Sequence, residues 1–219
     1  AIDVGANYGL YTYNLSKAVG DNGFVYAFEP IPYTFRTLKR IIKLFRLKNV
    51  QLINKGCSDN KGKIKFSVPL QDNGTISAGL AFIDMNEKSR SARLNRGEYS
   101  EVVTIESEIV KIDDLNYKKV SFIKVDVEGA ELMVLKGAIK TIKKSRPIVM
   151  IEIEDRWIES YDIKRKDISN FFSDLNYQTH YYFNKKLIKC DINYTKSNNL
   201  IFIPHEHKII VYLYYNKLY

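Results

Sequence analysis

The sequence is poor in the residues that cross-link small folds or bind metals. Its two cysteines, Cys57 and Cys190, lie far apart and form no C-x-x-C motif, which argues against a disulfide framework or a cysteine-based zinc site. His205 and His207 have a spacing typical of a surface strand, but the sequence shows no third ligand nearby. We therefore expect no metal site, and we expect a reducing compartment, the cytoplasm.

The sequence also has no long apolar run, and it has no glycine in its last third. No apolar run approaches the ~20 residues that cross a bilayer, so the sequence predicts no transmembrane segment. All eleven glycines lie at or before Gly137, which places the ligand-shaping loops in the first two thirds of the chain. Because the sequence starts inside an expected strand, we expect a piece of a longer protein and leave membrane association through an upstream segment open.

The composition allows one substantial core. With 219 residues, of which 45% are hydrophobic, we expect one domain. The net charge of +9 is compatible with nucleic acid, anionic lipid or phosphorylated partners. A genome biased toward Lys and Asn would give the same excess, so nucleic acid is not the favoured partner. The sequence does not indicate an oligomeric state.

The first nine residues predict a strand, a tight turn and the start of a helix. Asp3 closes a short apolar run, and Gly5 and Gly9 allow sharp turns and close approach of the backbone to a ligand. Asn7 tolerates a positive φ, and the helix expected over 10–19 would direct its first amides at the ligand. We therefore predict a cofactor-binding turn made of Gly5, Ala6, Asn7, Tyr8 and Gly9.

A second acidic residue supports this site. The next expected strand, 23–28, ends at Glu29, where a carboxylate can accept hydrogen bonds from both ribose hydroxyls of an adenosine. The small residues do not follow the G-x-G-x-x-G spacing of a dinucleotide fingerprint, so a nicotinamide dehydrogenase is the weakest alternative. An acid after each of the first two strands predicts a site for S-adenosyl-L-methionine, with Asp3, Glu29 and Pro30 among its contacts.

The middle of the chain changes pattern. An amphipathic basic helix is expected over 33–47 and a third strand over 50–54, after which Asp59 is placed to reach the adenine amino group. Residues 63–112 contain stretches of alternating polar and apolar residues, which predict an inserted β-hairpin region. Long insertions of this kind usually carry substrate contacts.

The second landmark is the run 120–131. It reads as a buried strand that ends at Asp126, followed by a turn at Gly129 and a helix over 130–144. Ligands of open parallel sheets bind outside the carboxyl ends of the strands, so Asp126 and Glu128 should face the same crevice as Glu29. Further strands and helices to about residue 204 complete an α/β/α sandwich with antiparallel pairing at its edge.

The two landmarks, DVGANYG with FEP and IKVDVEGAELMVLKGA, together resemble the FkbM family of S-adenosylmethionine-dependent methyltransferases. The match covers residues 1 to about 204, with 205–219 as a C-terminal extension. The resemblance implies a class I methyltransferase (Rossmann-like) fold, a three-layer α/β/α sandwich whose mostly parallel seven-stranded sheet has an antiparallel edge strand. It also implies O-methylation of a hydroxyl on a sugar, lipid or secondary-metabolite acceptor.

Methyl transfer to an alcohol needs alignment and a proton acceptor. Holding the acceptor oxygen about 3 Å from the methyl carbon supplies much of the catalysis, and a nearby carboxylate can take the hydroxyl proton. Asp126 is the first candidate for that role, and also for a contact to the cofactor, and Glu128 is the second. Asp126 could instead cap the following helix, and Glu131 is expected to be a first-turn or surface residue of that helix.

Two alternatives stay open. An RNA methyltransferase is suggested by the basic charge and by Lys124, Asp126 and Glu128, although no RNA-stacking module is recognisable. The second alternative is a catalytically silent module that binds the cofactor within a larger glycan-assembly protein.

Overall fold

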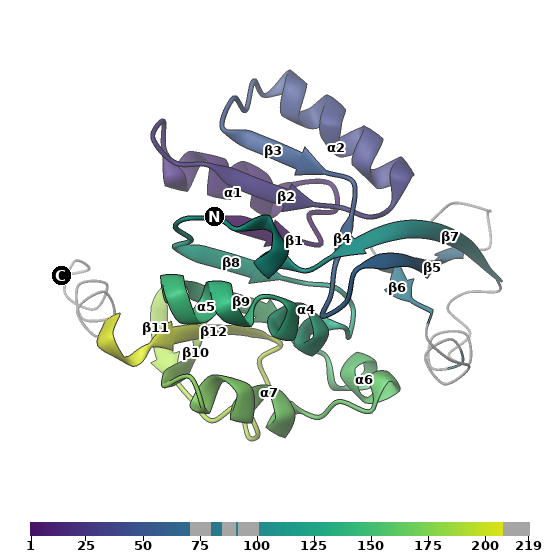
Figure 1. Ribbon diagram of the computed structural model, residues 1–219. Helices are drawn as coiled ribbons and strands as arrows, with labels where there is room; N and C mark the ends of the chain where they lie inside the picture. The colour runs from purple at the N-terminus through teal and green to yellow at the C-terminus, as the bar shows by residue number, and fades with distance from the viewer. Residues whose placement is uncertain (71–79, 85–90, 92–100, 208–219) are drawn as a thin grey trace.

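The computed structural model describes residues 1–70, 80–84, 91 and 101–207. An eight-stranded sheet forms the centre of the molecule, in the order β11-β10-β12-β9-β8-β1-β2-β3 (Figure 1). Its strands are β1 (Ile2–Val4), β2 (Val25–Phe28), β3 (Val50–Ile53), β8 (Phe122–Val125), β9 (Ile148–Glu152), β10 (Tyr177–Phe183), β11 (Lys186–Lys189) and β12 (Asn199–Pro204). The five strands from β3 to β9 are parallel, and those from β12 to β11 pair in antiparallel fashion.

The α/β class, the mostly parallel sheet and the antiparallel edge strand predicted from the sequence are confirmed, but the number of strands was wrong. The sheet has eight strands instead of seven, and besides the edge strand β11 a second strand, β12, runs antiparallel to the parallel set, inside the sheet between β9 and β10. Its apolar side chains are buried on both sides, which suits an interior position. The additional edge strand β11 follows a tight hairpin turn in which Asn184 and Lys185 have φ values of 46° and 62°.

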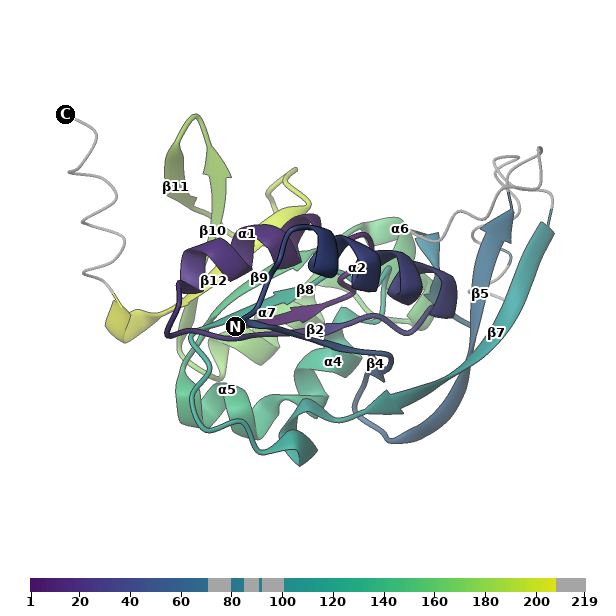
Figure 2. The same ribbon diagram turned by 90° about the horizontal axis from the view of Figure 1, so that it is seen from above.

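Helices cover both faces of the sheet (Figures 1 and 2). On one face lie α1 (Leu10–Val19) and α2 (Pro32–Leu44), and on the other lie α4 (Glu131–Gly137), α5 (Ile139–Ser145) and α7 (Arg165–Ser173). Successive side chains of β2 point to opposite faces of the sheet and so pack against both helix layers. Ala27 packs with Leu38 of α2, whereas its neighbour Phe28 belongs to the main core together with Leu135 of α4. The shorter helices are α6 (Asp155–Ile158), η2 (Ile112–Leu115), η3 (Glu159–Tyr161) and η4 (His205–His207).

Three predicted elements differ from the structure. The helix expected over 130–144 is divided into α4 and α5, and Gly137 at the break lies so close to the 57–59 turn that a Cβ there would be 2.0 Å from the carbonyl oxygen of Ser58. The helix expected to reach residue 47 ends at Leu44, because Arg46 is left-handed with a φ of 52°. His205 and His207 lie on one 3₁₀ turn and not on a strand.

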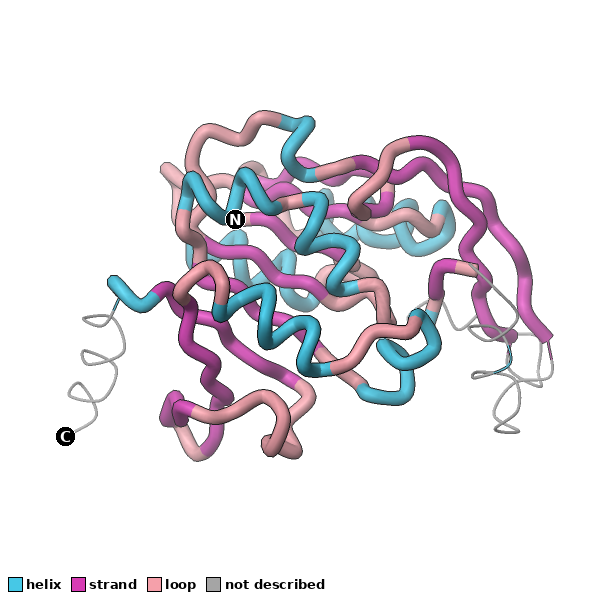
Figure 3. The backbone as a smooth tube through the Cα atoms, turned by 60° about the horizontal axis from the view of Figure 1, so that its bottom comes forward, coloured by secondary structure: helices cyan, strands magenta, loops and turns pink. Residues whose placement is uncertain are grey.

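A second sheet contains the two alternating stretches of the region 63–112. It consists of β4 (Gly56–Cys57), β5 (Gly62–Leu70), β6 (Phe82–Ile83) and β7 (Glu101–Val110), in the order β4-β7-β5-β6. Figure 3 shows β5 and β7 as a long ribbon that projects from one end of the main sheet. Within this ribbon, Phe66 and Val68 of β5 are buried and belong to the main core. Residues 208–219, most of the predicted extension, lie outside the described residues.

Within the described ranges, no helix combines the length and apolar composition that a membrane crossing needs. The same ranges contain no group of three or more His, Cys, Asp or Glu side chains arranged to hold a metal ion.

Candidate active site

A cleft of about 600 Å³, open to solvent, lies at the carboxyl ends of β1, β2 and β8. This is the edge at which open parallel sheets bind ligands. The second sheet closes one side of the cleft with Cys57, Phe66 and Ile83. Six residues predicted from the sequence line the cleft: Gly5, Asn7, Glu29, Pro30, Asp126 and Glu128.

Five other predicted residues do not line this cleft: Asp3, Ala6, Tyr8, Gly9 and Asp59. Ala6 and Gly9 are structural parts of the turn, and Tyr8 is 43% exposed. Asp59 accepts hydrogen bonds from the side chains of Ser58 (3.2 Å) and Asn60 (3.1 Å). Asp3 is completely buried beneath the turn. Their roles in binding stay predictions.

The turn after β1 is built by backbone hydrogen bonds and left-handed residues. The N–H groups of Gly5 and Ala6 donate to the carbonyl oxygen of Phe28, at 3.1 and 2.9 Å, which joins the turn to the end of β2. Gly5, Asn7 and Gly9 all have positive φ, of 75°, 49° and 88°. A Cβ on Gly5 would lie 1.9 Å from the carbonyl oxygen of Asp126, so only glycine allows β1 and β8 to end this close together.

Glu29 is held at the floor of the cleft by two backbone donors. Its Oε2 accepts a hydrogen bond from the N–H of Asn7 at 2.9 Å, and its Oε1 accepts one from the N–H of Ile31 at 2.8 Å. The residue is 4% exposed, and burial outweighs these hydrogen bonds and raises the pKa of its carboxyl to about 7. Each carboxylate oxygen keeps a second lone pair for a ligand.

Below the turn, Lys124 connects both acidic landmarks. Its Nζ donates to Asp126 Oδ2 at 3.0 Å and to the carbonyl oxygen of Gly5 at 3.1 Å, and lies 3.8 Å from Asp3 Oδ1. Asp3 also accepts a hydrogen bond from Thr12 Oγ1 at 2.6 Å. Burial raises the pKa of Asp3, while Lys124 acts in the opposite direction. The buried cation therefore fixes the glycine turn, Asp3 and Asp126 relative to one another.

Sequence reasoning left the role of Lys124 open between pairing with a carboxylate and reaching the rim of the crevice, although a signal for the pairing was present. A lysine two residues before Asp126 in a strand must project from the same face as that aspartate. Parallel pairing aligns Lys124 with Asp3, which puts the amino group between the two carboxylates. The contribution of Tyr11, whose ring centroid lies 4.9 Å from Lys124 Nζ, had no comparable signal because it depends on how α1 packs on the sheet.

The exit of β8 carries the two candidate catalytic acids. The side chain of Asp126 is 27% exposed, and that of its neighbour Glu152, at the end of β9, is partly buried. Burial and then the nearby Asp126 and Glu154 raise the pKa of Glu152. Glu128 has a left-handed backbone with a φ of 58°, a strained conformation of the kind that is common at functional sites.

Glu131 stabilises the turn that follows β8. It lies at the first position of α4 but is only 2% exposed, so the expected first-turn position is confirmed and the surface alternative is wrong. Its Oε1 accepts hydrogen bonds from the N–H groups of Val127 (3.2 Å) and Gly129 (3.0 Å). Glu131 thus ties the turn before α4 together, while Asp126 does not cap this helix and instead accepts a hydrogen bond from Lys124.

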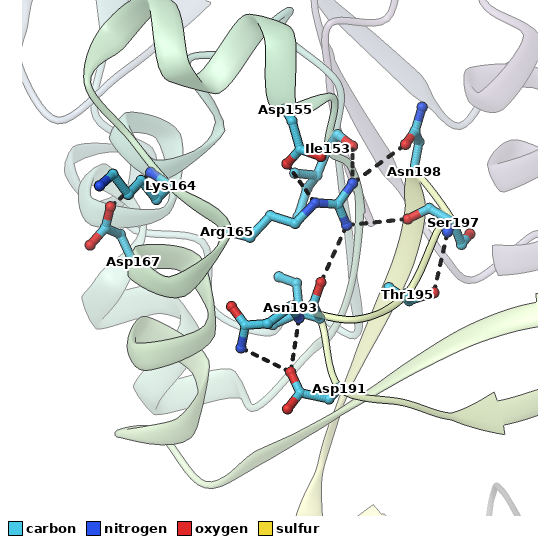
Figure 4. A network of polar contacts seen from close by, with 11 residues as sticks. Ile153, Asp155, Lys164, Arg165, Asp167, Asp191, Asn193, Thr195, Ser197 and Asn198 are labelled. Carbon is cyan, nitrogen blue, oxygen red and sulfur yellow. Dashed lines mark hydrogen bonds and ion pairs between the residues drawn. The ribbon is translucent and has the colours of Figure 1, made fainter.

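Arg165 holds together the segments next to the end of β9 (Figure 4). Its guanidinium donates to Asp155 Oδ1 at 2.6 Å, to the carbonyl oxygen of Ile153 at 3.3 Å and to that of Ser197 at 3.4 Å. These bonds tie the start of α7 to the segment after β9 and to the loop before β12. They stabilise the backbone next to Glu152.

The buried glutamates predict an unusual pH dependence of stability. Burial raises the pKa of Glu29 and of Glu131 from 4.5 to about 7, so between these values the folded state keeps protons that the unfolded state releases. The free energy of unfolding of the ligand-free domain should therefore increase as the pH falls from 7 toward 4.5, with each group contributing at most about 3 kcal/mol. Thermal unfolding across this window measures the effect. Glu131→Gln should flatten it, and a melting temperature that fell with pH would contradict the assignment.

Comparison with known proteins agrees with this arrangement. The family model described as the methyltransferase FkbM domain matches residues 3–179. The protein named methyltransferase 1 from Beauveria bassiana (strain ARSEF 2860) is 29% identical over 146 residues, which cover 62% of this chain and 57% of that protein. Methyltransferase sdnD from Sordaria araneosa is 27% identical over 157 residues, covering 62% of this chain and 59% of that protein. The chain thus spans less than two thirds of these relatives.

A solved structure extends the likeness to the fold. The crystal structure of methyltransferase FkbM from Methylobacillus flagellatus KT superposes with a TM-score of 0.58 at 18% identity, and the match covers 92% of this chain and 42% of that chain. An FkbM domain model that matches most of the chain, together with a glycine turn, Glu29 and Asp126 at one sheet edge, identifies the family. The chain belongs to the FkbM methyltransferase family.

Proposed function

We propose that this domain binds S-adenosyl-L-methionine in the cleft and transfers its methyl group to a hydroxyl oxygen of a sugar, lipid or secondary-metabolite acceptor. The observation that carries the proposal is the placement of Glu29 and Asp126 at one cleft, on either side of a turn that only glycine can form. Glu29 would accept hydrogen bonds from the ribose hydroxyls, and Asp126 would serve the reacting end.

Unpartnered atoms in the cleft support the fit of this cofactor. Asn7 Oδ1 is buried and has no hydrogen-bond partner among the described residues, although it lies in the cleft wall. Buried polar atoms normally have partners, so an acceptor left free at this place is suited to a donor on a ligand. The apolar walls contributed by Phe28, Ile31 and Ile83 suit a flat aromatic base, and Asp59 stays a candidate contact to its amino group.

The chemistry required of the protein is modest. The bound cofactor supplies an activated methyl group on a positively charged sulfur. The chain would hold the acceptor oxygen in line, and Asp126 would take the hydroxyl proton as the new bond forms. Lys124, hydrogen-bonded to Asp126 Oδ2, holds that carboxylate in place, while Glu128 and Glu152 lie close enough in the fold to share the proton-handling role.

Calorimetric titration of the chain with S-adenosylmethionine and with S-adenosylhomocysteine tests the binding step. We expect saturable binding of both at one site. An acceptor screen with cofactor labelled in its methyl group would then compare hydroxyl-bearing sugars, lipids and polyketides with RNA. Label transferred only to RNA would contradict the proposed acceptor class, and binding without transfer to any acceptor would identify a catalytically silent module.

Asp126→Asn should separate catalysis from binding. On the first acceptor that the wild type methylates, the rate at saturating cofactor should fall by roughly 10²- to 10⁴-fold, the usual contribution of a positioned base. The dissociation constant of the cofactor should change far less. Asp174→Asn, which alters an exposed carboxylate at the end of α7, is the matched control. An unchanged rate in Asp126→Asn would move the role of base to another residue, with Glu128 the next to test.

A further inference from the structure

The end of α2 exposes two large apolar side chains beside each other. Leu44 is 75% exposed and Phe45 is 53% exposed. The ring of Phe45 contacts that of Tyr13 in α1 edge-on, with centroids 5.3 Å apart. The left-handed Arg46 ends the helix directly behind this pair. The two apolar groups are therefore presented at a fixed corner of the α1–α2 layer, which faces the viewer in Figure 2.

The chain segment that contains this corner carries one sign of charge. Between Glu29 and Asp59 the sequence has no acidic residue, and its seven basic residues are Arg36, Lys39, Arg40, Lys43, Arg46, Lys48 and Lys55. Six of these are exposed, and among the described ion pairs only Lys55 has a carboxylate partner, Glu108. Lys17 of α1 adds a cation 5.5 Å from the ring centroid of Tyr13.

The helical spacing aligns these groups. Arg36, Arg40 and Leu44 follow one another at intervals of four, and Lys39 and Lys43 run beside them. Residues three and four apart are neighbours on a helix surface, so the cations form a continuous stripe that leads to Leu44. A solvated charged face accounts for the stripe but not for two adjacent exposed apolar groups at its end.

We propose that this surface, formed by Tyr13, Lys17, Arg40, Lys43, Leu44, Phe45 and Arg46, binds the surface of an anionic lipid bilayer. Its cations would lie against lipid phosphates, and Leu44 and Phe45 would enter the boundary between headgroups and acyl chains. Nucleic acid could use the cations and stack a base on the ring of Phe45, but Leu44, the more exposed of the pair, offers a base neither a stacking face nor a hydrogen bond. The apolar pair therefore favours a bilayer.

Vesicle flotation tests the proposal without knowledge of the acceptor. The full chain should float with vesicles made of equal parts phosphatidylcholine and phosphatidylglycerol and stay unbound with phosphatidylcholine alone. Leu44→Ser with Phe45→Ser should weaken binding by roughly tenfold, since each apolar group buried in the interface contributes to affinity. Arg40→Gln with Lys43→Gln should weaken it by at least as much.

The matched control removes the same charge elsewhere. Lys186→Gln with Lys189→Gln alters two exposed lysines on β11, at the edge of the sheet opposite to β3, and should leave flotation unchanged. Equal loss in this control would show non-specific attraction and overturn the proposal. The proposal would also be overturned if the wild-type protein did not float with anionic vesicles. A third contrary result would be tight binding to a single-stranded RNA oligonucleotide that depends on Arg40 and Lys43 but is insensitive to Leu44 and Phe45.

Discussion

Glu29→Gln is expected to weaken the binding of S-adenosylmethionine by roughly a hundredfold. The carboxylate is oriented by the N–H groups of Asn7 and Ile31, so its free lone pairs point in fixed directions. A hydrogen bond to a charged group contributes about 1.5–3 kcal/mol, and the amide would lose the charge and one of the two acceptors. Calorimetric titration of the wild type and the variant measures the difference directly.

Two further measurements distinguish a lost contact from a damaged fold. Because the pKa of Glu29 is raised to about 7, the wild type should bind the cofactor more weakly as the pH falls below that value, and the variant should have lost this dependence. Glu159→Gln changes an exposed glutamate and should leave affinity unchanged. If Glu29→Gln bound the cofactor as tightly as the wild type does, the ribose-binding role of this residue would be wrong.

Lys124→Met is expected to be the most destabilising single change in the site. The lysine is 4% exposed and Asp3 is completely buried, so the substitution leaves a carboxylate beneath the turn with only Thr12 as a donor. Breaking a buried ion pair by removing one partner costs about 3–5 kcal/mol. Urea unfolding should show this loss. Cofactor affinity should fall as well, because Gly5 and Asp126 lose the group that connects them.

Removing the carboxylate of Asp3 tests why Lys124→Met should lose stability. Asp3→Asn in the Lys124→Met background takes away the uncompensated charge, so the double variant should be more stable than Lys124→Met alone. Lys118→Met, at an exposed position before β8, is the control for the change of residue type. If the two substitutions were simply additive, the pair at 3.8 Å would have no energetic coupling and Lys124 would act on the turn alone.

The sequence by itself determined the parts that depend on local chemistry. The glycine turn, the carboxylates that follow β1, β2 and β8, and α1 with its bounds at Leu10 and Val19 all follow from residue type and periodicity. A strand-end acid must lie at the carboxyl edge once the sheet is parallel, so Glu29 and Asp126 could be assigned to one cleft in advance. The break at Gly137 could not, because it arises from contact with Ser58, far away in the sequence.

Only the tertiary structure decided how these pieces act on one another. It placed Lys124 between Asp3 and Asp126, because parallel register aligns β1 with β8 and packing removes water from the gap. Tertiary contacts also brought Phe66 and Ile83 of the second sheet to the cleft wall, a position that the alternating pattern of the sequence does not specify. The position of β12 inside the sheet likewise depends on a hairpin that returns the chain beside β9. Residue type specifies what a side chain can do, but burial and register, which depend on distant segments, specify which partner it meets.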